Sequence, residues 1–123
     1  MDLIIAPNAP AAIGPYSHAA VEEGLIFCSG QIPLDPESMT LLEGIEAQTH
    51  QVLDNMKAVL TAADSSLDKV IKTTIFLADM GDFPVVNGIY EEAFGSHKPA
   101  RSTIQVAALP LGAAIEIECV ASR

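Results

Sequence analysis

The chain has 123 residues, of which 50% are apolar and 18% are charged, the proportions of a packed globular protein rather than a disordered one. This length is typical of one domain, and we expect residues 1–123 to form a single folded unit. The formal net charge of -10 disfavours binding to nucleic acid or to anionic lipid, because both depend on Lys and Arg.

Targeting and metal-binding signals are absent from the sequence. No apolar run approaches the ~20 residues of a membrane-spanning helix, and MDLIIAPNAP lacks the basic start and long apolar core of a secretory signal. We therefore expect a cytoplasmic protein without a membrane partner.

Cys28 and Cys119 stand in apolar, strand-like runs without CxxC spacing, which predicts buried, reduced thiols. The histidines have no partners at ligand spacing, so no metal site is expected: His18, His50 and His97.

The first predicted elements are two strands within SHAAVEEGLIFCSGQIP, which turn at Glu23 and Gly24. From Ile45 to Ala63 apolar residues recur at spacings of three, four and seven, which predicts an amphipathic helix. The β-branched run VIKTTIFLA, residues 70–78, predicts a central strand. The solvated side of the helix would carry Gln48, Gln51, Asp54 and Lys57.

A second helix is predicted from Asp82, a suitable N-cap, to Phe94, where Gly95 ends it. Two strands, RSTIQVAAL and AAIEIECVA, complete the chain, and the intervening Pro-Leu-Gly turn would join them into a hairpin. Alternation in the last strand separates its residues into two faces. One face holds Ile115, Ile117 and Cys119, and the other holds Glu116, Glu118 and Val120.

The element order ββαβαββ predicts an α+β fold, with about five strands in a mixed sheet and two helices on one of its faces. The other face would remain partly apolar, with residues such as Ile26 or Phe27 exposed on it. A second copy of the chain is the simplest cover for such a face, so the sequence predicts a homo-oligomer.

Familiar catalytic motifs do not account for the chain, since it has no phosphate loop, no GxGxxG and no nucleophile elbow. Arg101 is the single internal arginine of this acidic chain, and its planar fork of donors suits a carboxylate or a phosphate. A sparse polar set remains near strand ends and on the second helix, and each member also has a structural explanation. The set is Tyr16, Ser29, Gly30, Asn87, Arg101, Thr103 and Glu116.

Six segments, taken in order, are similar to a known family: NAPAAIGPYSHA, SGQIP, LDNMKAVL, VIKTTIFLADMGDFPVVNGIYEEAF, PARSTIQVAALP and IEIE. Together they resemble the reactive-intermediate deaminases, the RidA or YjgF-type enamine/imine deaminases, nearly from end to end. The resemblance implies a chorismate-mutase-like fold that forms a homotrimer with active sites between subunits. It also implies hydrolysis, without a cofactor, of 2-iminopropanoate (from 2-aminoacrylate) and 2-iminobutanoate to 2-oxo acids and ammonia.

The resemblance also implies roles for individual residues. Arg101, in PARST, would clamp the substrate carboxylate, and Glu116, the first glutamate of IEIE, would position the attacking water and transfer protons. Tyr16 would close over the substrate. The pocket wall would include Ser29, Gly30 and Asn87, some of it from the neighbouring subunit.

Thr103 stands where many members of the family have cysteine, at a contact that the family makes largely through the main chain. Glu118, about 7 Å along the same strand face as Glu116, could raise the pKa of Glu116. Two alternatives stay open. One is a deaminase of the same fold for a different imine, and the other is a non-catalytic trimer that binds small carboxylates.

Overall fold

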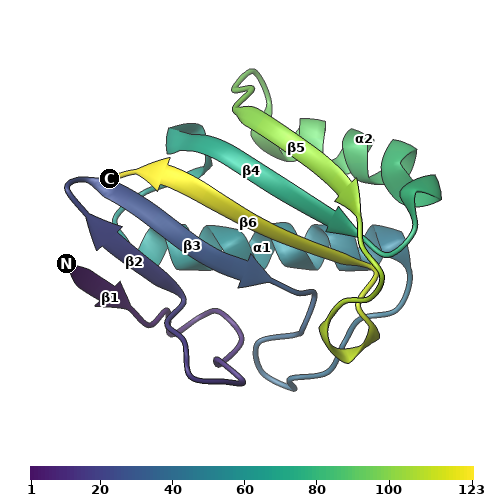
Figure 1. Cartoon of the computed structure of the whole chain (residues 1–123), viewed down its shortest axis with the longest axis horizontal. Coiled ribbons are helices and arrows are strands. Elements are labelled where there is room, and N and C mark those ends of the chain that lie inside the picture. Colours follow the sequence, from purple (N-terminus) through teal and green to yellow (C-terminus); the bar gives the residue numbers. More distant parts are fainter.

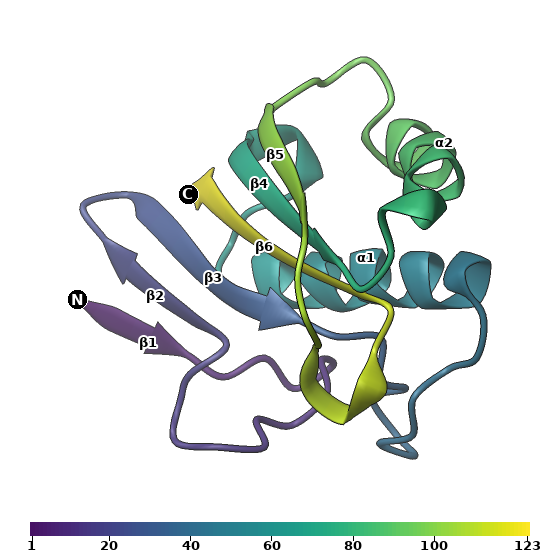
Figure 2. The ribbon, with the colours of Figure 1, turned by 45° about the vertical axis from the view of Figure 1, so that its right-hand side comes forward.

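The computed structural model describes residues 1–123 as a six-stranded mixed sheet with both helices on one of its faces, the fold class predicted from the sequence (Figures 1 and 2). Across the sheet the order is β1-β2-β3-β6-β4-β5, and only β4 and β5 run parallel. The strands are β1 (Asp2–Ile4), β2 (Ala19–Glu22), β3 (Leu25–Gln31), β4 (Val70–Leu77), β5 (Ala100–Gln105) and β6 (Ile115–Ser122). The helices are α1 (Ile45–Ala62) and α2 (Phe83–Phe94).

The hairpin between β2 and β3 confirms the predicted turn. Glu23 and Gly24 have φ values of 51° and 77°, and a two-residue turn with positive φ at both positions matches the twist of the strands that it joins.

The predicted hairpin between the last two strands is wrong. β5 pairs in parallel with β4, while β6 lies between β3 and β4 and runs antiparallel to both (Figure 1). The chain passes from β4 through α2 to β5, and such a crossover produces parallel neighbours. β6 therefore returns to the middle of the sheet, where Ile115, Ile117 and Cys119 are buried on the helix side as the alternation predicts.

The strand count and the open face also need correction. The three residues of β1 form an edge strand on β2, and they are too few to show an alternating pattern. Phe27 is 50% exposed on the face without helices, but Ile26 points the other way and is fully buried in the core. Leu25 is exposed beside Phe27 on the same side of β3, and Ile104 is exposed on the open face at the edge strand β5.

Both helices bury an apolar face, which for α1 is the periodic one predicted from the sequence. Gln48, predicted on the solvated side of α1, is instead buried: its Nε2 donates to Leu42 O and its Oε1 accepts from Ala114 N–H, both at 2.8 Å. These two bonds satisfy the amide and join α1 to the loop before it and to the approach to β6. The buried apolar residues of the helices include Val52, Met56, Val59, Leu60, Val86 and Phe94.

Cys28 and Cys119 are buried free thiols, as predicted, and they lie directly opposite each other on β3 and β6. The hydrogen bond to Cys28, together with burial, raises the pKa of Cys119. Neither helix is both long enough and apolar enough to cross a membrane.

Candidate active site

Six of the seven predicted site residues, all except Thr103, form two separate groups within one chain. We call Tyr16, Ser29, Gly30 and Glu116 the carboxylate half-site, because they line one cavity together. We call Arg101 with its partners on α2 the arginine half-site, which borders a second cavity.

The sheet register shows how far apart the two half-sites are. Arg101 pairs with Thr73 on β4, and Glu116 pairs with Phe76 on the same strand. Positions 73 and 76 differ by an odd number, so the two side chains project from opposite faces of the sheet. Three residues along the strand and two strand spacings across place their Cα atoms about 14 Å apart. One small substrate therefore cannot contact both residues of the same chain.

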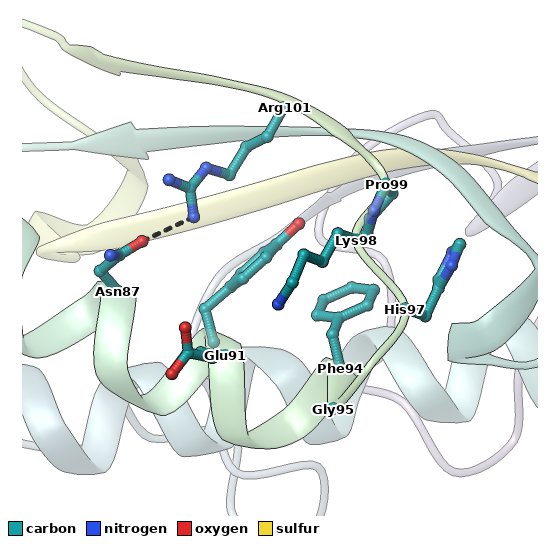
Figure 3. Close-up of a pocket in the computed structure, with 9 residues that line it drawn as sticks. Asn87, Glu91, Phe94, Gly95, His97, Lys98, Pro99 and Arg101 are labelled. Carbon is teal, nitrogen blue, oxygen red and sulfur yellow. Dashed lines mark hydrogen bonds between the residues drawn. The ribbon is translucent and has the colours of Figure 1, made fainter.

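α2 supplies a platform for Arg101. The Nη1 of Arg101 donates to Asn87 Oδ1 at 2.8 Å (Figure 3). The guanidinium carbon of Arg101 lies 4.9 Å from the ring centre of Tyr90 and 5.3 Å from that of Phe83. Positions 83, 87 and 90 follow one side of a helix at spacings of four and three. The hydrogen bond to Asn87 and the two adjacent rings hold the guanidinium in place, and its other N–H groups have no acceptor in the chain.

A buried hydrogen bond supports this platform from below. The hydroxyl of Tyr90 lies 2.7 Å from Thr73 Oγ1, and burial raises the pKa of Tyr90. Sequence reasoning missed both residues, although Tyr90 stands three positions after Asn87 and thus about one helical turn away. The cavity beside Arg101 has a volume of about 350 Å³, and its other lining residues include Glu91, Phe94, His97, Lys98 and Pro99 (Figure 3).

Thr103 follows Arg101 by two positions on β5 and is paired with the buried Ile75. Its Oγ1 is buried and has no hydrogen-bond partner. The side chain lines neither of the two cavities, so its contact with substrate stays a prediction.

The carboxylate of Glu116 lies directly against Gly30. A Cβ atom placed on Gly30 would stand 2.6 Å from Oε2 and 2.8 Å from Cδ of Glu116, so only glycine leaves room for the carboxylate. The pairing of β3 with β6 is irregular between Cys28 and Gln31, and Gly30 lies within this irregularity. The cavity around Glu116 has a volume of about 350 Å³, and its remaining lining is Ile13, Ile32 and Pro110.

The surroundings of Glu116 favour its protonated form. Burial raises its pKa, and the negative charge of Glu118 raises it further, which confirms the effect expected of Glu118. Glu116 has no ion pair with Lys or Arg. A raised pKa moves a carboxyl group towards the range in which a general acid or base is effective.

Ser29 and Tyr16 occupy the cavity in different ways. The Ser29 hydroxyl donates to Ser17 O at 2.7 Å, so it holds the segment that carries Tyr16 rather than presenting a free donor. Tyr16 is 45% exposed, and its ring forms part of the cavity wall.

Known proteins resemble the whole of this chain. Residues 6–123 match the model of the family described as endoribonuclease L-PSP. Reactive Intermediate Deaminase A, chloroplastic, of Arabidopsis thaliana is 50% identical over 122 residues, which cover 98% of this chain and 65% of that protein. The 2-iminobutanoate/2-iminopropanoate deaminase of Salmonella typhimurium is 44% identical over 123 residues, covering 98% and 96%.

A solved structure agrees over the same length. The crystal structure of E. coli TdcF with bound serine matches with a TM-score of 0.96 at 37% identity, covering 100% of this chain and 99% of that one. The chain therefore belongs to the endoribonuclease L-PSP family, the group that includes the RidA and YjgF-type reactive intermediate deaminases.

Proposed function

We propose that this protein is a hydrolytic deaminase of small 2-imino acids, with 2-iminopropanoate and 2-iminobutanoate as substrates. The observation that carries the proposal is the carboxylate of Glu116, which lies against Gly30 with a raised pKa and no cationic partner. Relatives with names of this activity cover the chain from end to end, and a neighbour binds serine, which is also a small carboxylate.

Arg101 would bind the carboxylate of the substrate. Its guanidinium is always charged and can donate two parallel hydrogen bonds, while Asn87 and the rings of Tyr90 and Phe83 keep its plane fixed. Ile13 and Ile32 give the carboxylate half-site an apolar wall, which suits a methyl or ethyl side chain.

Glu116 would carry out the proton transfers. As the carboxylate it removes a proton from water while the oxygen attacks C2 of the protonated imine. As the acid it returns that proton to nitrogen, and the C–N bond then breaks while the C2 hydroxyl gives its own proton to Glu116, so that ammonia leaves and the 2-oxo acid forms. Ammonia takes this last proton from Glu116. The net reaction consumes one protonated imine and one water and releases one 2-oxo acid and one ammonium ion, so no further reactant is needed. Proton transfer of this kind contributes about 100- to 10000-fold.

A complete site requires two chains under this proposal. Arg101 and Glu116 lie on opposite faces of one sheet, so the arginine half-site of one subunit must meet the carboxylate half-site of the next. The exposed apolar residues on the open face, such as Phe27, supply a surface that assembly would cover. We therefore propose a homotrimer with three sites between subunits.

The activity is tested by adding the protein to a serine or threonine dehydratase reaction that contains semicarbazide as a competing trap. The wild-type protein should speed formation of the free 2-oxo acid, and Arg101→Ala and Glu116→Gln should each lose this effect. An Arg101→Ala variant as fast as the wild type would contradict the proposal.

The shared site is tested by mixing the two inactive variants. Trimers are refolded from equal amounts of Arg101→Ala and Glu116→Gln chains. A site is then intact when its Arg101 comes from a Glu116→Gln chain and its Glu116 comes from an Arg101→Ala chain. Random assembly gives about one quarter of the wild-type activity. If both residues of a site came from one chain, the mixture would stay inactive.

A non-catalytic carboxylate-binding protein is the competing function. One observation favours it: within a single chain, Asn87 and Tyr90 already hold Arg101 in a position to bind a carboxylate, although Glu116 of that chain is not near it. Calorimetry with 2-oxobutanoate separates the two functions, because binding without any turnover of the imine would support the competing one. Phosphate-backbone binding is disfavoured by the net charge of -10.

A further inference from the structure

The segment of residues 5–17 carries part of the carboxylate half-site but contains no helix or strand. It contributes Ile13 and Tyr16 to the cavity, and both side chains are about half exposed, at 55% and 45%. Such a segment is mobile unless its backbone is anchored. The position of Tyr16 in the cavity of Glu116 therefore depends on what holds this segment.

His18 provides an anchor from inside the protein. It is 2% exposed, its Nδ1 lies 2.8 Å from Ala6 N, and its Nε2 lies 2.8 Å from Pro10 O. A backbone N–H can only donate, so Nδ1 must be the bare nitrogen and Nε2 must carry the hydrogen that Pro10 O accepts. One neutral imidazole thus joins two points of the segment, and both hydrogen bonds are buried.

The backbone of His18 extends this anchor to both flanking strands. His18 N–H donates to Ile4 O at the end of β1, and His18 O accepts from Ser29 N–H on β3, at 3.0 and 2.9 Å. One residue earlier, Ser17 O accepts the hydroxyl of Ser29. The chain at positions 17 and 18 is therefore fixed to β3, and the arc from Ala6 to Pro10 is fixed to His18.

We propose that His18 is a positioning residue of the carboxylate half-site, which acts on the reaction through Tyr16. This inference rests on the proposed function. Without the imidazole, the Ala6 N–H and the Pro10 carbonyl would be buried without partners, and the segment would move to reach water. Tyr16 lies in the chain between the arc from Ala6 to Pro10 and Ser17, which stays fixed to β3, so its side chain would lose one of the two supports that keep it in the cavity wall.

Two substitutions separate the hydrogen bonds of His18 from its bulk. His18→Gln keeps an acceptor and a donor on one side chain, so it can still bond both Ala6 and Pro10. His18→Leu has a comparable size but neither group. His50, which is exposed on α1, provides the matched controls His50→Gln and His50→Leu. If His18→Leu does not fold, His18→Asn replaces it, since its shorter amide cannot reach both partners.

The place of Tyr16 can be measured without reference to activity. The chain has no tryptophan and only two tyrosines, so in a Tyr90→Phe background Tyr16 is the only residue that fluoresces on excitation in the tyrosine absorption band. Acrylamide should quench Tyr16 more strongly in His18→Leu than in the parent, while His18→Gln and both His50 variants should resemble the parent. Unchanged quenching in His18→Leu would overturn the positioning role.

Steady-state kinetics test the link to the reaction. His18→Leu should raise KM for 2-iminobutanoate, with kcat/KM lower by about tenfold or more, and His18→Gln should restore most of the loss. A purely structural role would reduce the amount of folded enzyme, and therefore the apparent kcat, while KM stayed unchanged. That result would overturn the proposal. A His18→Gln variant as impaired as His18→Leu would overturn it as well. A wild-type protein without deaminase activity would refute the proposed function, and the quenching experiment would then decide the role of His18.

Discussion

Replacement of Gly30 by alanine places one methyl group against the proposed catalytic carboxylate. The new Cβ would stand 2.6 Å from Oε2, 2.8 Å from Cδ and 3.1 Å from Cγ of Glu116. Ordinary contacts begin near 3.5 Å, so the carboxylate must move by about 1 Å. A displacement of that size at a reacting group costs about 100-fold in rate, which corresponds to about 3 kcal/mol of transition-state stabilisation.

The fold should tolerate this change, so the effect on activity can be isolated. Gly30 is not among the residues with positive φ, and the atoms that its new methyl group meets belong to the flexible end of a side chain. Gly88→Ala is the matched control, because a Cβ at this position in α2 meets nothing within 4 Å. That control should keep full activity and gain up to ~1 kcal/mol of stability from helix propensity.

The assay compares kcat/KM for 2-iminobutanoate and thermal unfolding of the wild type, Gly30→Ala and Gly88→Ala. We expect a loss of about 100-fold for Gly30→Ala alone, with a melting temperature close to that of the wild type. A Gly30→Ala enzyme with wild-type kcat/KM would refute the reasoning, since the carboxylate would then not need the place that it occupies beside Gly30.

Three further substitutions test the two half-sites. Glu118→Gln should move the acidic limb of the plot of kcat/KM against pH to lower pH. The limb should not reach the pH expected for an ordinary glutamate, because burial, the larger cause of the raised pKa of Glu116, remains. An acidic limb at the wild-type pH would contradict the role of Glu118. Glu116→Gln should abolish turnover without lowering the melting temperature at pH 7. Folding raises the pKa of Glu116, so the free energy of unfolding falls as pH rises from the unfolded-state pKa to the folded-state pKa, and the ionised carboxylate destabilises the folded protein at neutral pH. A large drop in the melting temperature of Glu116→Gln would show instead that the ionised carboxylate stabilises the folded protein. Arg101→Lys should keep the charge but raise KM by about tenfold or more, because the bidentate fork and its stacking on Tyr90 are lost; an unchanged KM in the coupled assay would show that charge alone suffices.

Local sequence patterns were sufficient for the elements themselves. The 3.6-residue periodicity predicted α1, the flanking Asp82 and Gly95 predicted the limits of α2, and the alternation in β6 placed Glu116 opposite the buried Ile115 and Ile117. These features depend on neighbours within a few residues, which is the range over which propensity and hydrophobic pattern act. The residue types of the site followed from the family resemblance rather than from any such pattern.

The pairing of distant strands could be settled only by the tertiary structure. The sequence suggested a hairpin of the last two strands, yet β6 lies between β3 and β4, because the α2 crossover places β5 parallel to β4 at the sheet edge. That arrangement puts Arg101 and Glu116 on opposite faces and brings Gly30 against Glu116. Both relations join residues far apart in the chain and depend on sheet register, in which a shift of one residue reverses the face of every side chain. The hydrogen bonds of His18 to Ala6 and Pro10 likewise depend on the folded path of a segment without helix or strand, which no periodic pattern predicts.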